Sequence, residues 1–286
     1  MNVTTLDARR GPRAPRTAFV LGGGGNLGAI QVGMLDALIE RGILPDLVLG
    51  CSVGALNAGA IASDPTPDGV ARLRRVWLDP ATWQVFSPGR MTGPWLLLRR
   101  GRSMVSNERL RGLVESTIPH THFEDFAVPL HVVAASLRTG RARWFSAGPV
   151  VEAILASAAL PAVLPPVSID GELLIDGAVV DNVPISRALA LGADRVFVLH
   201  VGNFERPRPE PQRPLDVLLQ AFSIARNERF LRECDVQHEG REVIVLPGID
   251  PGPLKRNDFS RTAELIRRGR AAAATFLDTS GIAASI

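Results

Sequence analysis

The 286-residue chain has no tyrosine, only two cysteines and no apolar run long enough to cross a membrane. Two cysteines, Cys51 and Cys234, cannot build the disulfide framework typical of small secreted proteins. A membrane-spanning helix needs about 18 or more consecutive apolar residues. The N-terminal stretch "MNVTTLDARRGPRAPR" also lacks the apolar segment of a secretory signal. These absences exclude a disulfide scaffold and predict a cytoplasmic location.

Positive and negative charges nearly balance along the chain. The chain has 32 basic and 29 acidic residues, for a net charge of +3, and the arginines are spread along the chain without a dense tract. Nucleic-acid binding therefore receives little support, although a pI near 9.6 permits weak attraction to anionic membranes. Hydrophobic residues make up 46% of the chain, which is enough to bury a large core in one domain.

Hydrophobic periodicity predicts alternating strands and helices. We expect strands at residues 16–21, 47–50, 130–135, 142–145, 173–175, 195–201 and 243–246. We expect helices at residues 29–41, 54–63, 107–116, 150–159, 185–191, 215–234 and 261–277. The β-α-β-α order of the first 63 residues favours a parallel sheet.

Composition suggests how the chain is divided. Residues 1–15 are polar and rich in arginine and proline, which predicts a disordered arm. Residues 16–205 would form the main domain, and the proline-rich stretch "RPRPEPQRP" at 206–214 reads as an exposed connector. Residues 215–286 are then expected to be an extension packed on the same domain.

A run of glycines follows the first expected strand. Residues 22–28, "GGGGNLG", contain Gly23, Gly25 and Gly28 in the spacing G-x-G-x-x-G, and Asp46 lies about 20 residues further on. That pattern fits a dinucleotide site. Glycines also allow several backbone N–H groups to converge on one negative centre, which can equally be the oxyanion of an acyl-transfer reaction.

A second motif favours acyl transfer. Residues 50–54, "GCSVG", match G-x-S-x-G at the point where a short apolar strand becomes a helix, which is where a nucleophile elbow belongs. Gly50 and Gly54 would leave room for a tight turn, and Ser52 would stand at the N-terminus of a helix whose dipole stabilises negative charge. An N-cap serine is the simpler alternative. The nucleotide interpretation weakens because Asp46 precedes the second strand rather than ending it.

A third motif, Asp176-Gly177-Ala178, follows an apolar strand and precedes "VVDNVPI". In this order, and with "ASAALPAVLPPV" before the acid and Asn182 and Pro184 after it, the three motifs resemble the patatin-like phospholipase family. The resemblance covers roughly residues 16–198. It implies an α/β fold of three layers, α/β/α, around a mainly parallel sheet, and a serine acyl hydrolase acting on lipid esters without metal or cofactor. The residues it implies are a Ser52–Asp176 dyad, an oxyanion hole at Gly23, Gly24, Gly25 and Gly28, an elbow at Gly50 and Gly54, and an acid motif completed by Gly177 and Ala178.

One residue departs from the family pattern. Leu27 occupies a position in the glycine motif where the family usually has a basic residue, which leaves head-group preference open. A catalytically silent lipid-binding protein is therefore an alternative. His200, at the end of an expected strand, is a further alternative as the base of a Ser-Asp-His triad. Asp181 is expected to be structural or solvated.

The stretch "SPGRMTGPWLLLRRGRSM", residues 87–104, combines an apolar cluster with arginines. An apolar patch bracketed by arginines can insert into a lipid surface while the guanidinium groups meet phosphates. An ordinary buried helical turn is the alternative. The residues expected to touch a membrane are Trp95, Leu96, Leu97, Arg99 and Arg100.

Overall fold

The computed structural model describes residues 15–80, 82, 107–161, 163–201, 210–235, 240–252 and 258–282. The expected N-terminal arm up to residue 14, the whole 87–104 stretch with its membrane-contact residues, and residues 206–209 of the connector lie outside this part. None of the helices in the described ranges is long and apolar enough to cross a membrane.

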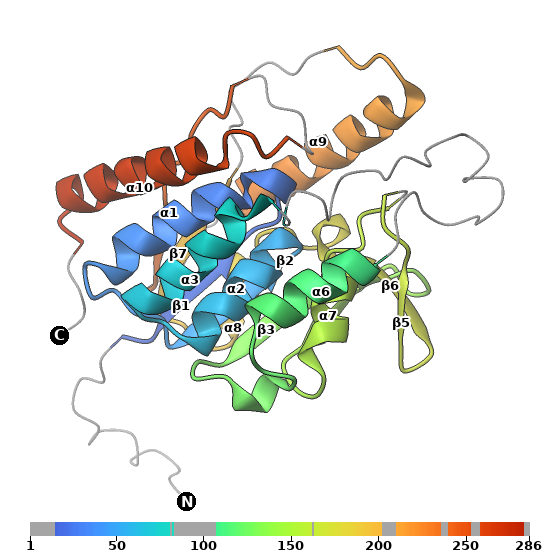
Figure 1. Ribbon diagram of the computed structural model, residues 1–286, viewed down its shortest axis with the longest axis horizontal. Coiled ribbons are helices and arrows are strands. Elements are labelled where there is room, and N and C mark those ends of the chain that lie inside the picture. Colours follow the sequence, from blue (N-terminus) through green and yellow to red (C-terminus); the bar gives the residue numbers. More distant parts are fainter. Residues whose placement is uncertain are drawn as a thin grey trace, which may run out of the picture.

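A mixed sheet forms the centre of the protein (Figure 1). Its strands run in the order β5-β6-β3-β2-β1-β7-β8, with β4 also pairing β3. The central neighbours β3, β2, β1, β7 and β8 pair in parallel, whereas β4, β5 and β6 pair antiparallel. The strands are β1 (Thr17–Leu21), β2 (Leu47–Cys51), β3 (Leu130–Ser136), β4 (Ala142–Phe145), β5 (Val167–Ile169), β6 (Glu172–Asp176), β7 (Arg195–Leu199) and β8 (Glu242–Val245).

Helices cover both faces of the sheet, as the expected three-layer architecture requires. The helices are α1 (Gly28–Ile39), α2 (Val53–Ser63), α3 (Pro67–Leu78), α6 (Glu108–Thr117), α7 (Val150–Ser157), α8 (Ile185–Ala190), α9 (Pro214–Asp235) and α10 (Thr262–Thr279), with 3-10 turns η1 (Gly25–Leu27), η2 (Phe123–Asp125) and η3 (Gly177–Val179). Side chains along β1 alternate between two hydrophobic cores, one on each face of the sheet. Phe19 and Leu21 pack in the core formed with α1, α2, α3, α6, α7 and α10, whereas Ala18 and Val20 pack in the core formed with α8 and α9.

The C-terminal part shares these cores. Strand β8 extends the sheet beside β7, Phe230 of α9 joins the second core, and α10 lies along α1 (Figure 1). The contact between α1 and α10 is close because glycines meet there: a Cβ on Gly33 would lie 2.1 Å from the carbonyl oxygen of Ile266. The buried residues of α9, β8 and α10 therefore lie in cores that they share with the preceding strands and helices.

The fold class expected from the sequence is confirmed, and every expected strand and helix is present with ends that differ by at most two residues. Among the strands and α-helices of the described residues, β5 and α3 were not predicted. Helix α3 carries a clear start signal, since Thr66 caps it by accepting a hydrogen bond from Gly69 N–H and Pro67 is its first residue. Its buried residues Val70, Leu73 and Trp77 have helical spacing, but arginines between them mask the pattern.

Two identical substitutions test the α1–α10 contact. Gly33→Ala should lower the free energy of unfolding by about 1–3 kcal/mol, because its new methyl group overlaps the backbone of α10. Gly112→Ala, on α6, is the matched control: its methyl group meets nothing within 4 Å and should stabilise the helix by up to about 1 kcal/mol. Chemical denaturation measures both. A Gly33→Ala protein as stable as the wild type would contradict this packing.

Candidate active site

Ser52 occupies the turn between β2 and α2. Its backbone has φ 55° and ψ −126°, a conformation that residues other than glycine rarely adopt. The flanking glycines are required by space: a Cβ on Gly50 would lie 2.5 Å from Ala55 Cα, and one on Gly54 would lie 2.2 Å from Leu21 O. The strained turn presents the Ser52 side chain at the N-terminus of α2, in the manner of a nucleophile elbow.

The hydroxyl of Ser52 donates a hydrogen bond directly to Asp176. Ser52 Oγ lies 2.7 Å from Asp176 Oδ2, although the two residues are 124 positions apart. Strand pairing brings them together, because Cys51 is opposite Val133 on β3 and Asp176 is opposite Ala134. The backbone N–H of Ser52 donates to Ser157 Oγ at 2.9 Å, which fixes the turn from the side of α7.

Asp176 is buried in a setting that suits a base. Its side chain is 2% exposed, and burial raises its pKa to about 6. Hydrogen bonds from Ala178 N–H, at 2.8 Å, and from Ser52 Oγ oppose this shift, as does the positive charge of Arg226 on α9. Gly177 is needed here because a Cβ would lie 2.3 Å from Val133 O. The carboxylate is therefore ionised above about pH 6 and poised to accept a proton.

The glycine loop, residues 22–28, follows β1 and packs against the nucleophile turn. A Cβ on Gly23 would lie 3.0 Å from Ser52 Cβ, so a side chain there would crowd the serine. Gly23 N–H donates to Asn182 Oδ1 at 3.2 Å and is thus already engaged. Within the described ranges, Gly24 N–H and Gly25 N–H have no acceptor. These two groups are the donors that the loop leaves available to a negatively charged ligand.

Two other sequence-predicted glycine-loop residues have packing roles. Gly28 begins α1, and a Cβ there would lie 2.7 Å from a methyl group of Val53 and 2.8 Å from the ring of Trp77. Leu27, where the family pattern has a basic residue, is half-buried against the main core. Hence this position contributes apolar packing rather than charge.

The geometry argues against a dinucleotide site. Asp46 accepts a hydrogen bond from Thr17 N–H at 2.8 Å. Both residues lie at the amino ends of β1 and β2, whereas the glycine loop follows the carboxyl end of β1. The acid that would bind a ribose therefore lies at the amino ends of the strands, whereas the loop that would bind the phosphates lies at their carboxyl ends.

His200 does not join the pair. Its ring is 3% exposed and stacks on Phe230 of α9 with 4.5 Å between centroids. Burial, helped by the charge of Arg226, lowers its pKa to about 3, so the imidazole is neutral at physiological pH. Neither Ser52 nor Asp176 forms a hydrogen bond with it. The expected alternative of a Ser-Asp-His triad has no support in this arrangement.

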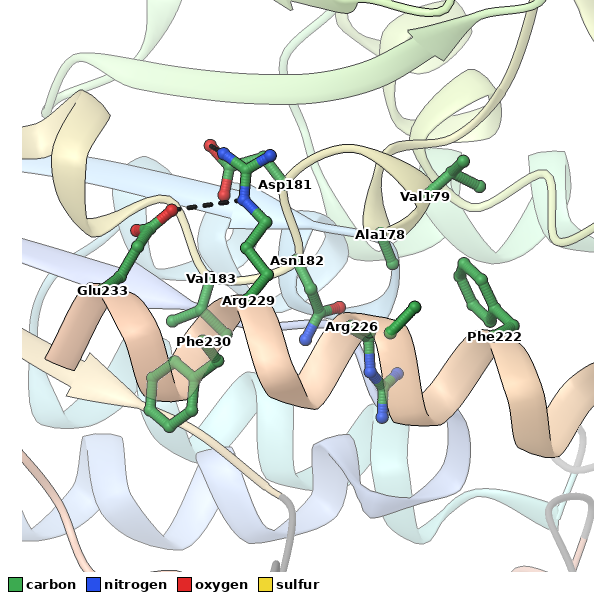
Figure 2. A pocket seen from close by; sticks show the side chains of 11 residues that line it. Ala178, Val179, Asp181, Asn182, Val183, Phe222, Arg226, Arg229, Phe230 and Glu233 are labelled. Carbon is green, nitrogen blue, oxygen red and sulfur yellow. Dashed lines mark hydrogen bonds and ion pairs between the residues drawn. The ribbon is translucent and has the colours of Figure 1, made fainter. Parts of the chain in front are cut away.

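Asp181 belongs to a neighbouring cavity between residues 178–183 and α9. Figure 2 shows the guanidinium group of Arg229 beside the carboxylates of Asp181 and Glu233. Asp181 is buried rather than solvated, and its pKa is raised to about 7 by burial and by the charge of Glu233, against the opposing charge of Arg229. The cavity measures about 60 Å³, far below the few hundred Å³ typical of ligand pockets. These charges therefore join α9 to the site segment rather than bind substrate.

Several residues around the site received no role of their own in the sequence-based interpretation. Ser157, which accepts the hydrogen bond from Ser52 N–H, was recognised only as part of the stretch "ASAALPAVLPPV", because its small neighbours give no local signal of that bond. Gln31 and Asn57 do give a local signal: each is an amide between apolar or small neighbours in a helix, and a buried amide needs a polar partner. Asn182 was recognised only as part of the motif after the acid, without its bond to Gly23.

Known proteins are similar to this chain in sequence or in fold. A family model described as patatin-like phospholipase matches residues 19–189. Lysophospholipase nte1 of Emericella nidulans is 33% identical over 197 residues, which are 67% of this chain and 12% of that protein. An uncharacterised NTE family protein of Mycobacterium bovis is 30% identical over 196 residues, 68% of this chain and 52% of that protein. The chain thus spans about half the length of the second relative and a small part of the first.

Among solved structures, VipD from Legionella pneumophila superposes with a TM-score of 0.51 at 15% sequence identity, covering 93% of this chain and 67% of that one. At this identity the likeness concerns the fold alone.

Proposed function

Since this chain belongs to the patatin-like phospholipase family, we propose that it is a serine hydrolase that cleaves ester bonds of lipids, with Ser52 as nucleophile and Asp176 as its base. The observation that carries the proposal is the direct hydrogen bond of 2.7 Å from Ser52 Oγ to Asp176 Oδ2. A buried carboxylate with a pKa near 6 is ionised at neutral pH and can take the serine proton without an imidazole between them.

The reaction follows from these positions. Ser52 Oγ attacks the ester carbonyl carbon while its proton passes to Asp176, and the carbonyl oxygen becomes an oxyanion near the N–H groups of Gly24 and Gly25 and the N-terminus of α2. When the carbon–oxygen bond to the alcohol breaks, Asp176 returns the proton to the leaving oxygen. Water then attacks the acyl-enzyme by the same proton path, which releases the fatty acid and restores Ser52.

The proposed substrates are esters of phospholipids, lysophospholipids or neutral lipids. The fungal relative is named a lysophospholipase, which supports an ester of a fatty acid with a phospholipid or lysophospholipid backbone. Leu27 supplies no charge to a head group, so neutral lipids belong to the same class of candidates. A cytoplasmic location is also part of the proposal. Cys51 and Cys234 are free thiols, as is usual for proteins of a reducing compartment.

Replacing the nucleophile tests the core of the proposal. Ser52→Ala should reduce hydrolysis in a panel of lipid esters by about a thousandfold or more, since no other group can form the acyl-enzyme. Ser63→Ala, on the same helix, is the matched control and should keep wild-type rates, because its hydroxyl bonds only to Gly59 O. Ser52→Ala with most of its activity would contradict the assignment. Wild-type protein that binds fatty acid but hydrolyses nothing would favour the catalytically silent alternative.

The choice between dyad and triad has its own test. Asp176→Asn should lower kcat/KM by about a thousandfold, because the amide cannot accept the proton, whereas His200→Gln should keep a substantial part of it. In the wild type, kcat/KM should rise with pH through about 6, as Asp176 loses its proton, and then level off. His200→Gln as inactive as Ser52→Ala, in a protein that remains folded, would show that the base is the histidine.

Contact with a lipid surface through Trp95, Leu96, Leu97, Arg99 and Arg100 is part of the same proposal and rests on their sequence pattern. The double variant Trp95→Ser/Leu97→Ser should lose activity on anionic vesicles several-fold more than on a soluble short-chain ester, because only the vesicle requires insertion. Parallel assays on the two substrates measure the difference. Equal losses on both would assign the segment to the protein core.

A further inference from the structure

Two amide side chains are buried behind the glycine loop. Gln31 of α1 and Asn57 of α2 are both 0% exposed, and the residues beside each of them in the helix are apolar or small. They bond to each other, with Asn57 Nδ2 donating to Gln31 Oε1 at 2.8 Å, and the indole N–H of Trp77 on α3 donates to Asn57 Oδ1 at 2.8 Å. We call these three side chains the amide network.

The amide network holds both ends of the glycine loop. Gln31 Nε2 donates to the carbonyl oxygen of Gly22, at 2.7 Å, and to that of Leu199, at 3.0 Å. Asn57 Nδ2 donates its second hydrogen bond to the carbonyl oxygen of Gly28, at 3.0 Å. Gly22 and Gly28 are the first and last residues of the loop. Every donor of the two amides is thereby used, which is the condition for burying such groups without a large penalty.

Stability alone gives a weak reason for this arrangement. A buried hydrogen bond contributes about 1 kcal/mol net, and well-packed apolar side chains of similar volume contribute as much. Apolar side chains, however, cannot hold a carbonyl group in one orientation. A loop rich in glycine has many accessible conformations, and oxyanion donors work only when they are fixed within about 0.5 Å of the productive position.

We propose that Gln31, Asn57 and Trp77 are positioning residues that fix the glycine loop for oxyanion binding, an inference that rests on the hydrolase function proposed above. Asn57 lies on α2, the helix whose N-cap is Ser52, and it bonds to the carbonyl oxygen of Gly28 at the end of the glycine loop. The same loop carries Gly24 and Gly25. The same side chain thus sets the spacing between the nucleophile and the loop donors. Asn182, which accepts from Gly23 N–H, holds the loop at a third point.

Isosteric substitutions remove the donors without leaving a cavity. Asn57→Asp keeps the acceptor for Trp77 but supplies at most one of the two N–H donors that it replaces. Gln31→Glu keeps the acceptor for Asn57 and likewise supplies at most one donor to the carbonyl oxygens of Gly22 and Leu199. Both should lower kcat for ester hydrolysis about 10- to 100-fold, with KM within about threefold. This is less than the roughly 100- to 1,000-fold cost of losing an oxyanion donor outright, because the loop donors are displaced and not removed. The rise of activity near pH 6 should remain, because Asp176 is untouched.

Trp77→Phe provides a graded third variant: it keeps an aromatic ring but loses the indole N–H bond to Asn57 and part of the buried ring volume, while the amide bonds to the loop remain. Its kcat should fall less than about tenfold, again with KM nearly unchanged. If the amide variants do not fold, this variant decides alone. Unchanged kcat in folded Trp77→Phe would then overturn the inference.

Val114→Ala is the control for stability, because it removes buried methyl groups of α6 outside the loop and the network. We expect it to lower the Tm by an amount comparable to the amide variants while keeping wild-type kcat. Amide variants that lose stability to the same degree and keep wild-type kcat would show that the network is only structural. Ser52→Ala and wild type, assayed in parallel, separate the two proposals: a wild type without hydrolysis overturns both, whereas an active wild type with fully active amide variants overturns this one alone.

Discussion

The hydrogen bond from Ser52 Oγ to Asp176 Oδ2 joins two segments that are remote in sequence. The surrounding structure holds the two oxygen atoms 2.7 Å apart. Parallel pairing of β2 with β3 brings the end of the serine strand beside β3, and antiparallel pairing of β6 with β3 brings the acid to the same edge. Gly50, Gly54 and Gly177 are the residues that permit such close approach, since each lies against the backbone of a neighbouring segment. A methyl group at any of them would move one partner away from the other.

Burial gives this hydrogen bond its chemical character. Removing Asp176 from water raises its pKa to about 6, so the carboxylate becomes a stronger base while remaining ionised at neutral pH. The same low-dielectric environment lowers the pKa of His200 to about 3, and its ring is stacked on Phe230 away from the pair. Desolvation thus raises the basicity of Asp176 and keeps His200 neutral, which supports the proposal that Asp176 activates Ser52 without an imidazole.

Local patterns in the sequence predicted those features that have local causes. The glycines of residues 22–28, 50–54 and 177 mostly lie where another segment leaves no room for a side chain. Glycines clustered after an apolar strand are visible in the sequence, so the positions of the glycine loop and of the turns after β2 and β6 were predictable. Alternating strands and helices predicted the layered fold in the same way. Features that depend on distant partners were not predictable: the bond from Ser52 N–H to Ser157, the antiparallel insertion of β6, and the partners of Gln31 and Asn57 appear only when the chain has folded.

The most direct measurement is the rate at which a fluorophosphonate labels the wild-type protein as a function of pH, with the adduct located by peptide mass spectrometry. Because the probe reacts with an activated serine hydroxyl, we expect one adduct, on Ser52, whose rate of formation rises through about pH 6 as Asp176 ionises. An adduct on another residue, or labelling of Ser52 with no dependence on a group near pH 6, would contradict the claim that Asp176 activates Ser52 directly.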